Sequence, residues 1–274
     1  MAWNMIGSLV YAGSSMVLTA LVNHLIGTEQ GGIFGFAFST FGQQMFLVAY
    51  FGMRPLQSTD TSKSYTFSEY RLARLVTCSM AVLFGMGYII FNTLSPSAGY
   101  TAQKALVVFL MVLYKVLDGF ADVYESEFQR NGRLYLTGQA MAFRTLLSVF
   151  CFLGTLAVTK ELIFSCVVAV LSQGAGILLF DKRAAKRVPG IVFTRTPGRQ
   201  WRLLQDGFLL FLSVFFGRAH FCHGKICGGC PDDCYGQRCF CGNFYADLGH
   251  QSGGQLCDTS LFDQYVLSVG GKEF

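Results

Sequence analysis

The sequence predicts an all-α membrane protein, in which six transmembrane helices form one lobe, followed by a truncated seventh helix and an irregular cysteine-rich tail. Three observations predict this fold class. Of the 274 residues, 52% are hydrophobic and only 14% are charged, whereas soluble domains carry about 25% charged residues. Long apolar stretches follow one another up to residue 180 and leave no polar faces for a soluble surface. Lysine and arginine gather in alternate connections between these stretches.

The first three predicted spans each end at a polar or proline-containing turn. A hydrocarbon core about 30 Å thick is crossed by roughly 20 predominantly apolar helical residues. Residues 5–26 reach this length before the polar sequence GTEQGG. Residues 33–53 stop at an Arg-Pro pair, and residues 75–94 stop at the sequence SPS. Proline cannot continue a helix without losing a backbone hydrogen bond, which makes these stops specific.

Three further spans and part of a seventh follow. Residues 105–117 form a shorter apolar core, residues 141–158 form a longer one, and residues 162–180 end at the charged run DKRAAKR. Residues 203–216 begin like a span and end early. We therefore expect residues 1–202 to form the six-helix lobe.

Positively charged residues predict the orientation. A cytoplasmic N-terminus puts fifteen lysines and arginines in or beside inner loops near residues 54–74, 118–140 and 181–202. Only Lys104 and Lys160 then lie outside, and the other four are in the tail. This asymmetry follows the positive-inside rule. Topology and lipid headgroups then account for the net charge of +5, so no nucleic-acid partner is expected.

Polar residues at membrane depth are candidates for a function. Such groups are costly in lipid, so they should face the bundle interior or a watery cavity. Those within the apolar stretches include Asn23, His24, Gln43 and Gln44. For the glutamines, hydrogen bonding between helices is the simpler role. Arg144 is interpreted as an end-of-helix charge that reaches out to the interface.

Neither acid–base groups nor enzyme motifs are expected inside the lobe. His24 is the only histidine in residues 1–216, so a histidine triad or a multi-histidine metal site cannot form there. No Walker loop, HExxH or G-x-S-x-G sequence occurs. We expect no enzymatic activity and no cofactor. The four carboxylates closest to the fourth span are placed in or next to an inner loop: Asp118, Asp122, Glu125 and Glu127.

Two loop sequences resemble a known transporter family. QSTD and YTFSEYRLAR follow the second span, and EFQRNGRLYLTG follows the fourth. Together with WNMIGSLVYAGSS and GGIFGFAFSTFGQQ, these sequences resemble the N-terminal half of Wzx-type polysaccharide flippases. That family belongs to the superfamily that includes the multidrug and toxin exporters. The resemblance covers about residues 3–216.

The resemblance implies a fold, a substrate and a location. It implies two six-helix lobes facing each other across a central cavity in the bacterial plasma membrane. The implied substrate is a lipid-pyrophosphate-linked oligosaccharide, which rocking of the lobes turns over between leaflets. A sugar chain cannot cross hydrocarbon unaided, so the protein must offer a polar, partly cationic cleft.

Two sets of site residues follow. The candidates for lining the cleft are Asn4, His24, Gln43, Gln44 and Arg54. The residues that match the family's inner-loop motif are Gln57, Asp60, Tyr70, Arg71 and Arg133. For the second set, a structural capping or docking role stays open beside a functional one, because Asp60 with the following Thr and Ser has the chemistry of a turn or helix start.

The tail, residues 217–274, holds seven of the ten cysteines. Cys227 and Cys230, with Cys234 and His223, could ligate zinc. Only one CxxC occurs, the other spacings are irregular, and seven cysteines cannot all pair as disulfides. We favour a frameshift, because alanine-rich coding sequence read out of frame yields cysteine and glycine. The tail is then expected to be poorly ordered and the chain to be an incomplete, inactive N-terminal lobe.

Three other functions remain open. A drug or small-cation exporter of the same fold would be favoured by an ionisable carboxylate in the first spans, and none occurs there. A membrane-anchored zinc-binding or redox regulator would act through the tail. A homo-oligomeric channel is not suggested by the inner-loop motifs.

Overall fold

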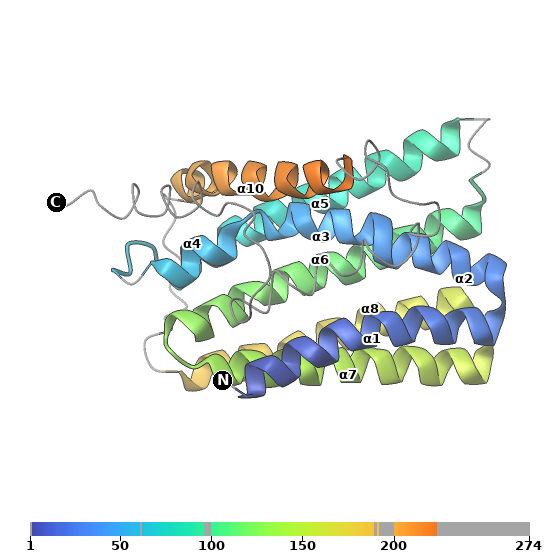
Figure 1. Cartoon of the computed structure of the whole chain (residues 1–274), viewed down its shortest axis with the longest axis horizontal. Helices are drawn as coiled ribbons and strands as arrows, with labels where there is room; N and C mark the ends of the chain where they lie inside the picture. Colours follow the sequence, from blue (N-terminus) through green and yellow to red (C-terminus); the bar gives the residue numbers. More distant parts are fainter. Residues whose placement is uncertain (1, 61, 96–99, 189–190, 192–199, 224–274) are drawn as a thin grey trace, which may run out of the picture. The chain divides into compact units, whose positions relative to one another are not determined.

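The computed structural model describes residues 2–60, 62–95, 100–188, 191 and 200–223. The chain divides into two units, Met1–Asp233 and Cys234–Phe274, and every described residue belongs to the first. Within the described ranges the chain is helical and contains no strand (Figure 1).

Five helical stretches are long and apolar enough to cross a membrane. They are α1 (Ala2–Ile26), the α2–α4 stretch (Thr28–Thr59), α5 (Phe67–Leu94), α7 (Leu134–Thr159) and the α8–α9 stretch (Leu162–Arg187). They coincide with five of the six predicted spans. The all-α class is confirmed for the described residues, and the length and composition of these five stretches agree with a multi-pass membrane protein.

The second spanning stretch is built from several pieces. It consists of α2 (Thr28–Gly35), the π-helical segment η1 (Phe36–Phe41), α3 (Gly42–Tyr50) and α4 (Met53–Thr59). A left-handed Phe51-Gly52 pair separates the last two helices. The predicted stop at the Arg-Pro pair therefore falls in the first turn of α4, where proline lacks only an N–H that a helix start leaves unpaired.

The fourth predicted span lies in α6 (Ala102–Arg130) and is much longer than expected. The apolar residues 105–117 continue without a break into a charged half, so this helix is not among the five of suitable composition. The crossing of the membrane by α6 stays a prediction. It packs against α3 and α5 on one side and against α7 and α8 on the other (Figure 1).

The inner loops are shorter than the sequence suggested. The stretches near residues 54–74 and 118–140 are mostly helical, and the connections shrink to residues 60–66 and 131–133. At the third expected loop, α8 (Leu162–Gly176) continues through the π-helical segment η3 (Ile177–Asp181) into α9 (Lys182–Arg187). In the first two stretches, helix continues because buried charges of α4, α5 and α6 are paired within the bundle.

The truncated seventh span, expected at residues 203–216, is part of α10 (Gln200–His223). This helix packs against α5 and α4. The predicted zinc ligands Cys227, Cys230 and Cys234 lie outside the described residues, as does the side chain of His223.

Buried side chains form two apolar clusters along α6. One cluster surrounds Val108 and Met111 and includes Phe34 and Phe152. The other surrounds Tyr124 and lies toward the C-terminal end of α6. Large apolar side chains on the outer helices are exposed, for example Leu83, Phe84, Phe91 and Leu94 on α5. The most polar helix is therefore central and the apolar helices surround it, which is the arrangement expected in lipid.

Candidate functional site

The charged half of α6 presents three carboxylates on one face. Asp118, Asp122 and Glu125 are spaced four and then three residues apart, which brings them together along one side of a helix. All three are buried. The sequence predicts these residues in or next to an inner loop. They lie inside the bundle instead, because α6 continues as one helix through this stretch.

Arg144 of α7 is central to this cluster. One guanidinium nitrogen, Nη2, lies 3.0 Å from Asp118 Oδ1 and 2.7 Å from Glu125 Oε1. The other, Nη1, lies 3.1 Å from Oδ2 of Asp181, which ends η3. The side chain is only 2% exposed. The interpretation of Arg144 as a charge reaching to the interface is wrong, because its guanidinium points inward and joins three elements.

Asp122 is paired with two more arginines. Arg74 Nη2 of α5 lies 2.5 Å from Asp122 Oδ2, and Arg54 Nη1 of α4 lies 2.7 Å from Asp122 Oδ1. Arg74 also donates to the carbonyl oxygens of Ala49 and Tyr50 at the end of α3. Arg74 is fully buried, whereas Arg54 is 25% exposed. We call these three arginines and four carboxylates the ionic cluster: Arg54, Arg74, Arg144, Asp118, Asp122, Glu125 and Asp181.

Neutral and aromatic groups complete the surroundings of Asp118. The Tyr11 hydroxyl donates to Asp118 Oδ2 over 2.8 Å, and Gln173 Nε2 donates to Asp118 Oδ1 over 3.2 Å. Lys115, one turn earlier on α6, places its Nζ 4.1 Å from the ring centre of Phe38. Buried charges are tolerated only when they are paired and hydrogen-bonded. Every charge of the ionic cluster is paired, and the cluster joins α4, α5, α6, α7 and η3. Three of its buried atoms, Arg74 Nε, Arg144 Nε and Asp181 Oδ1, have no hydrogen-bond partner among the described residues.

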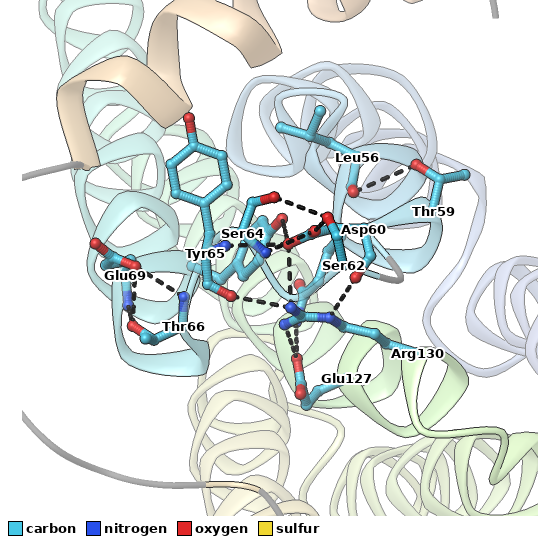
Figure 2. A network of polar contacts seen from close by, with 12 residues as sticks. Leu56, Thr59, Asp60, Ser62, Ser64, Tyr65, Thr66, Glu69, Glu127 and Arg130 are labelled. Atoms are coloured by element: carbon cyan, nitrogen blue, oxygen red, sulfur yellow. Dashed lines mark hydrogen bonds and ion pairs between the residues drawn. The ribbon is translucent and has the colours of Figure 1, made fainter. Parts of the chain in front are cut away.

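A second polar network surrounds the connection between α4 and α5 (Figure 2). Asp60 accepts hydrogen bonds from the amides of Ser64 (2.9 Å) and Tyr65 (3.2 Å) and from the Ser62 hydroxyl (3.1 Å). Burial alone would raise the pKa of Asp60. The amide hydrogen bonds and the Arg130 guanidinium outweigh burial and hold this pKa below its ordinary value.

Arg130, the last residue of α6, holds this connection in place. Its Nη2 lies 3.0 Å from Asp60 Oδ2 and donates over 3.0 Å to the Tyr65 carbonyl, while its Nε donates to the Asp60 carbonyl over 2.9 Å. Its Nη1 lies 3.4 Å from Glu127 Oε2. Gln57 Nε2 donates to the same Glu127 oxygen over 2.8 Å. We call the residues connected in this way the loop network: Gln57, Asp60, Ser62, Ser64, Tyr65, Glu127 and Arg130.

Local signals in the sequence shape the start of α5. The Thr66 hydroxyl accepts from the Glu69 amide, and the Glu69 carboxylate accepts from the Thr66 amide over 2.7 Å, which forms a capping box. Tyr70, one residue later, is fully buried and donates to Asp60 Oδ2 over 3.2 Å. On α10, Asp206 accepts from the Tyr65 hydroxyl over 2.8 Å.

The predicted motif residues are partly united by the loop network. Gln57 and Asp60 belong to it, and Tyr70 donates a hydrogen bond to Asp60. Arg71 is half-buried on α5, and Arg133 is half-buried where α7 begins. These contacts hold the connection between α4 and α5 against α6, which agrees with the capping or docking role. A functional role of the same residues stays a prediction.

The predicted cleft residues are not gathered at one place. Asn4 and His24 lie twenty residues apart on α1, which corresponds to about 30 Å along a helix. Gln43 is half-buried and Gln44 is exposed on α3. Arg54 belongs to the ionic cluster. Lining of a cleft by these residues stays a prediction.

No metal site is found within the described ranges, where no group of three or more histidine, cysteine or carboxylate side chains is arranged to hold an ion.

Comparison of the chain with protein-family models, curated proteins and solved structures returns no match. The class of the molecule therefore follows from its geometry, which is that of a helical multi-pass membrane protein with buried ion pairs at one end of the bundle.

Proposed function

We propose that this chain is the N-terminal lobe of a flippase that moves lipid-linked oligosaccharide across the bacterial plasma membrane for surface polysaccharide synthesis. One observation supports the proposal above all. The two sequence blocks that carry the family resemblance contact each other, since Gln57 binds Glu127, and Asp60 and Tyr65 bind Arg130. Blocks separated by about 70 residues in sequence thus act as one structural unit.

A rigid lobe is what alternating access requires. Rocking of one bundle against another moves substrate only if each bundle keeps its shape. The ionic cluster and the loop network fasten α4, α5, α7 and η3 to α6 at one end of the bundle. In the proposed lobe, α6 is the central helix and completes the six spans. A single lobe provides one wall of a cavity, so we expect the chain alone to be inactive and to need a second lobe.

The proposed orientation places the N-terminus and both networks on the cytoplasmic side. A pyrophosphate-linked substrate would enter from that side and needs a cation within reach. Of the three arginines in the ionic cluster, Arg54 has a quarter of its side chain exposed. We propose Arg54 as the cluster residue that faces the cleft.

Reconstitution in vesicles tests this function. The chain would be incorporated alone or together with a separately expressed C-terminal lobe of a Wzx-type flippase, with a fluorescent lipid-pyrophosphate oligosaccharide as substrate. We expect the outer-leaflet probe to become protected from an impermeant quencher only when both lobes are present. Absence of flipping by a demonstrated two-lobe complex would contradict the proposal, and flipping by the chain alone would contradict the expected inactivity.

The same vesicles distinguish the drug exporter of the same fold. The structure places carboxylates inside the bundle, which favours this alternative more than the sequence did, yet Asp118, Asp122 and Glu125 are each paired with arginine. Transport of an organic cation without flipping would assign the exporter function.

For the zinc-binding or redox regulator, stoichiometric zinc on purified protein that is lost on removal of residues 217–274 would assign the function to the tail.

A further inference from the structure

Four cations form an exposed face on α9. Lys182, Arg183, Lys186 and Arg187 occupy two pairs of positions four residues apart, and all four are exposed. None forms an ion pair with another residue of the described ranges. We call these side chains the basic face.

The opposite side of α9 is fixed to the bundle, so the basic face cannot turn inward. Ala185 and Val188 are buried in the same apolar cluster as Leu203 and Leu204 of α10. The preceding residue, Asp181, is buried and paired with Arg144. Its negative charge is thus neutralised inside the bundle, while the positive charges remain at the surface.

The basic face begins where the exposed apolar surface of the same helix ends. Leu171, Leu178 and Leu179 are exposed along the stretch Leu162–Arg187. A spanning helix keeps apolar residues toward the hydrocarbon and changes to charged residues at the headgroups. The change from leucine to lysine and arginine at residue 182 therefore marks the headgroup level.

Aromatic residues on neighbouring helices lie near the same end of the bundle. Phe143 of α7 stacks on Phe180 at 4.1 Å between ring centres. Exposed Tyr135 lies eight residues earlier on α7, which is about 12 Å farther toward this end of the bundle. Exposed Trp3 of α1 adjoins Gly138 of α7. Tryptophan and tyrosine prefer the membrane–water interface, which agrees with the level set by α9.

We propose that the basic face binds the phosphate headgroups of anionic phospholipids in the leaflet that this end of the bundle reaches. Clusters of four or more lysines and arginines directly beyond a spanning helix attract anionic lipid. Two of the four are arginines, which can bind a phosphate through two parallel hydrogen bonds. The inference requires only that the stretch Leu162–Arg187 spans the membrane, and it is independent of flipping.

Lipid binding to the purified full chain tests the proposal. The protein in neutral detergent would be titrated with short-chain phosphatidylglycerol, phosphatidylcholine or inorganic phosphate, and bound lipid would be counted by native mass spectrometry. The test variant is K182Q/R183Q/K186Q/R187Q. The matched control is K104Q/K160Q, which removes two cations that the structure places at the other end of the bundle. The pairs K182Q/R183Q and K186Q/R187Q serve if the quadruple variant does not fold.

We expect the wild type and the control to retain phosphatidylglycerol over phosphatidylcholine. The quadruple variant should bind phosphatidylglycerol at least about tenfold more weakly, and each pair should show an intermediate loss. Unchanged phosphatidylglycerol binding in these variants, or equal binding of both lipids by the wild type, would overturn the proposal. Binding of inorganic phosphate as tightly as phosphatidylglycerol would overturn it in favour of a soluble phosphate ligand. A negative result in the flipping assay would not change the result expected from this lipid-binding experiment.

Discussion

Arg144 illustrates at the scale of one residue how the bundle tolerates charge. Its two terminal nitrogens serve Asp118, Glu125 and Asp181, which belong to two different elements. Removing one partner from a buried ion pair leaves uncompensated charge and typically costs about 3–5 kcal/mol. The ionic cluster should therefore depend on Arg144 more than on any exposed cation.

The variant R144M tests this dependence. It keeps a long side chain and removes the charge, so three buried carboxylates lose their shared cation. We expect the free energy of unfolding in detergent to fall by about 3–5 kcal/mol. The control K160Q changes an exposed cation and should unfold like the wild type. An R144M protein as stable as the wild type would show that the cluster is not structurally important.

Asp60 should make stability depend on pH. Its pKa lies below the ordinary value in the folded protein, so its contribution is fully present above the unfolded pKa of about 4. That contribution is lost as the pH falls through the lower, folded pKa. The variant D60N cannot ionise, so its unfolding temperature should be lower at neutral pH and should change less between about pH 6 and 3 than that of the wild type. Parallel pH profiles for both proteins would contradict the assignment.

Some site residues could be predicted from the sequence and others could not. Gln57, Asp60 and Tyr70 stand in sequence blocks specific enough to single them out. The position predicted for Asp118 was wrong, because apolar composition ends the fourth span at its first charges. The role predicted for Arg144 was wrong, because a charge near the end of the fifth span has the same sequence pattern whether it reaches the interface or the bundle interior. The spacing 118, 122, 125 was the available signal, since it puts three acids on one helix face. Their partner Arg144 could not be deduced, because pairing across helices depends on how the helices pack.

At the scale of elements, α1 and α7 approach each other closely through glycine. A Cβ at Gly138 would overlap the Trp3 carbonyl oxygen, and a Cβ at Gly7 would overlap the Gly138 carbonyl oxygen. Gly13 on α1 and Gly154 on α7 have no such neighbours. Small residues that allow backbones to approach are typical of contacts between membrane helices.

The variants G138A and G154A compare a contact glycine with an open one on the same helix. We expect G138A to lower the free energy of unfolding by about 1–3 kcal/mol, because α1 must move away from α7. G154A should be neutral or slightly stabilising, since alanine favours helix over glycine. The comparison is made by thermal unfolding of both purified proteins in the same detergent. Equal effects of the two substitutions would contradict the predicted close contact.

The ends of the elements show what composition alone misses. The third span was expected to begin at residue 75, whereas α5 begins at Phe67. The sequence Thr66-Phe-Ser-Glu69 is a readable capping box, and it starts a helix whose first two turns are mostly buried although they carry three charged residues. A search for apolar stretches cannot find such turns, because their side chains are satisfied by other helices and not by lipid.

At the scale of the whole molecule, the apolar outer helices and the polar central helix form one consistent arrangement. The connections at residues 60–66 and 131–133 and the end of α9 lie at one end of the bundle (Figure 1). The connection between α7 and α8, which contains Lys160, lies at the other end. This alternation requires α6 to cross the membrane, and it agrees with the orientation that the lysines and arginines predict.

Labelling from the two sides of the membrane tests that arrangement most directly. The variants K63C and K160C would be made in a chain whose ten native cysteines are replaced by alanine, and intact cells would be treated with a maleimide that cannot cross membranes. We expect K160C to react in intact cells and K63C to react only after the membrane is opened. Reaction of K63C in intact cells, or reaction of both positions from the same side, would contradict the proposed arrangement of the helices in the membrane.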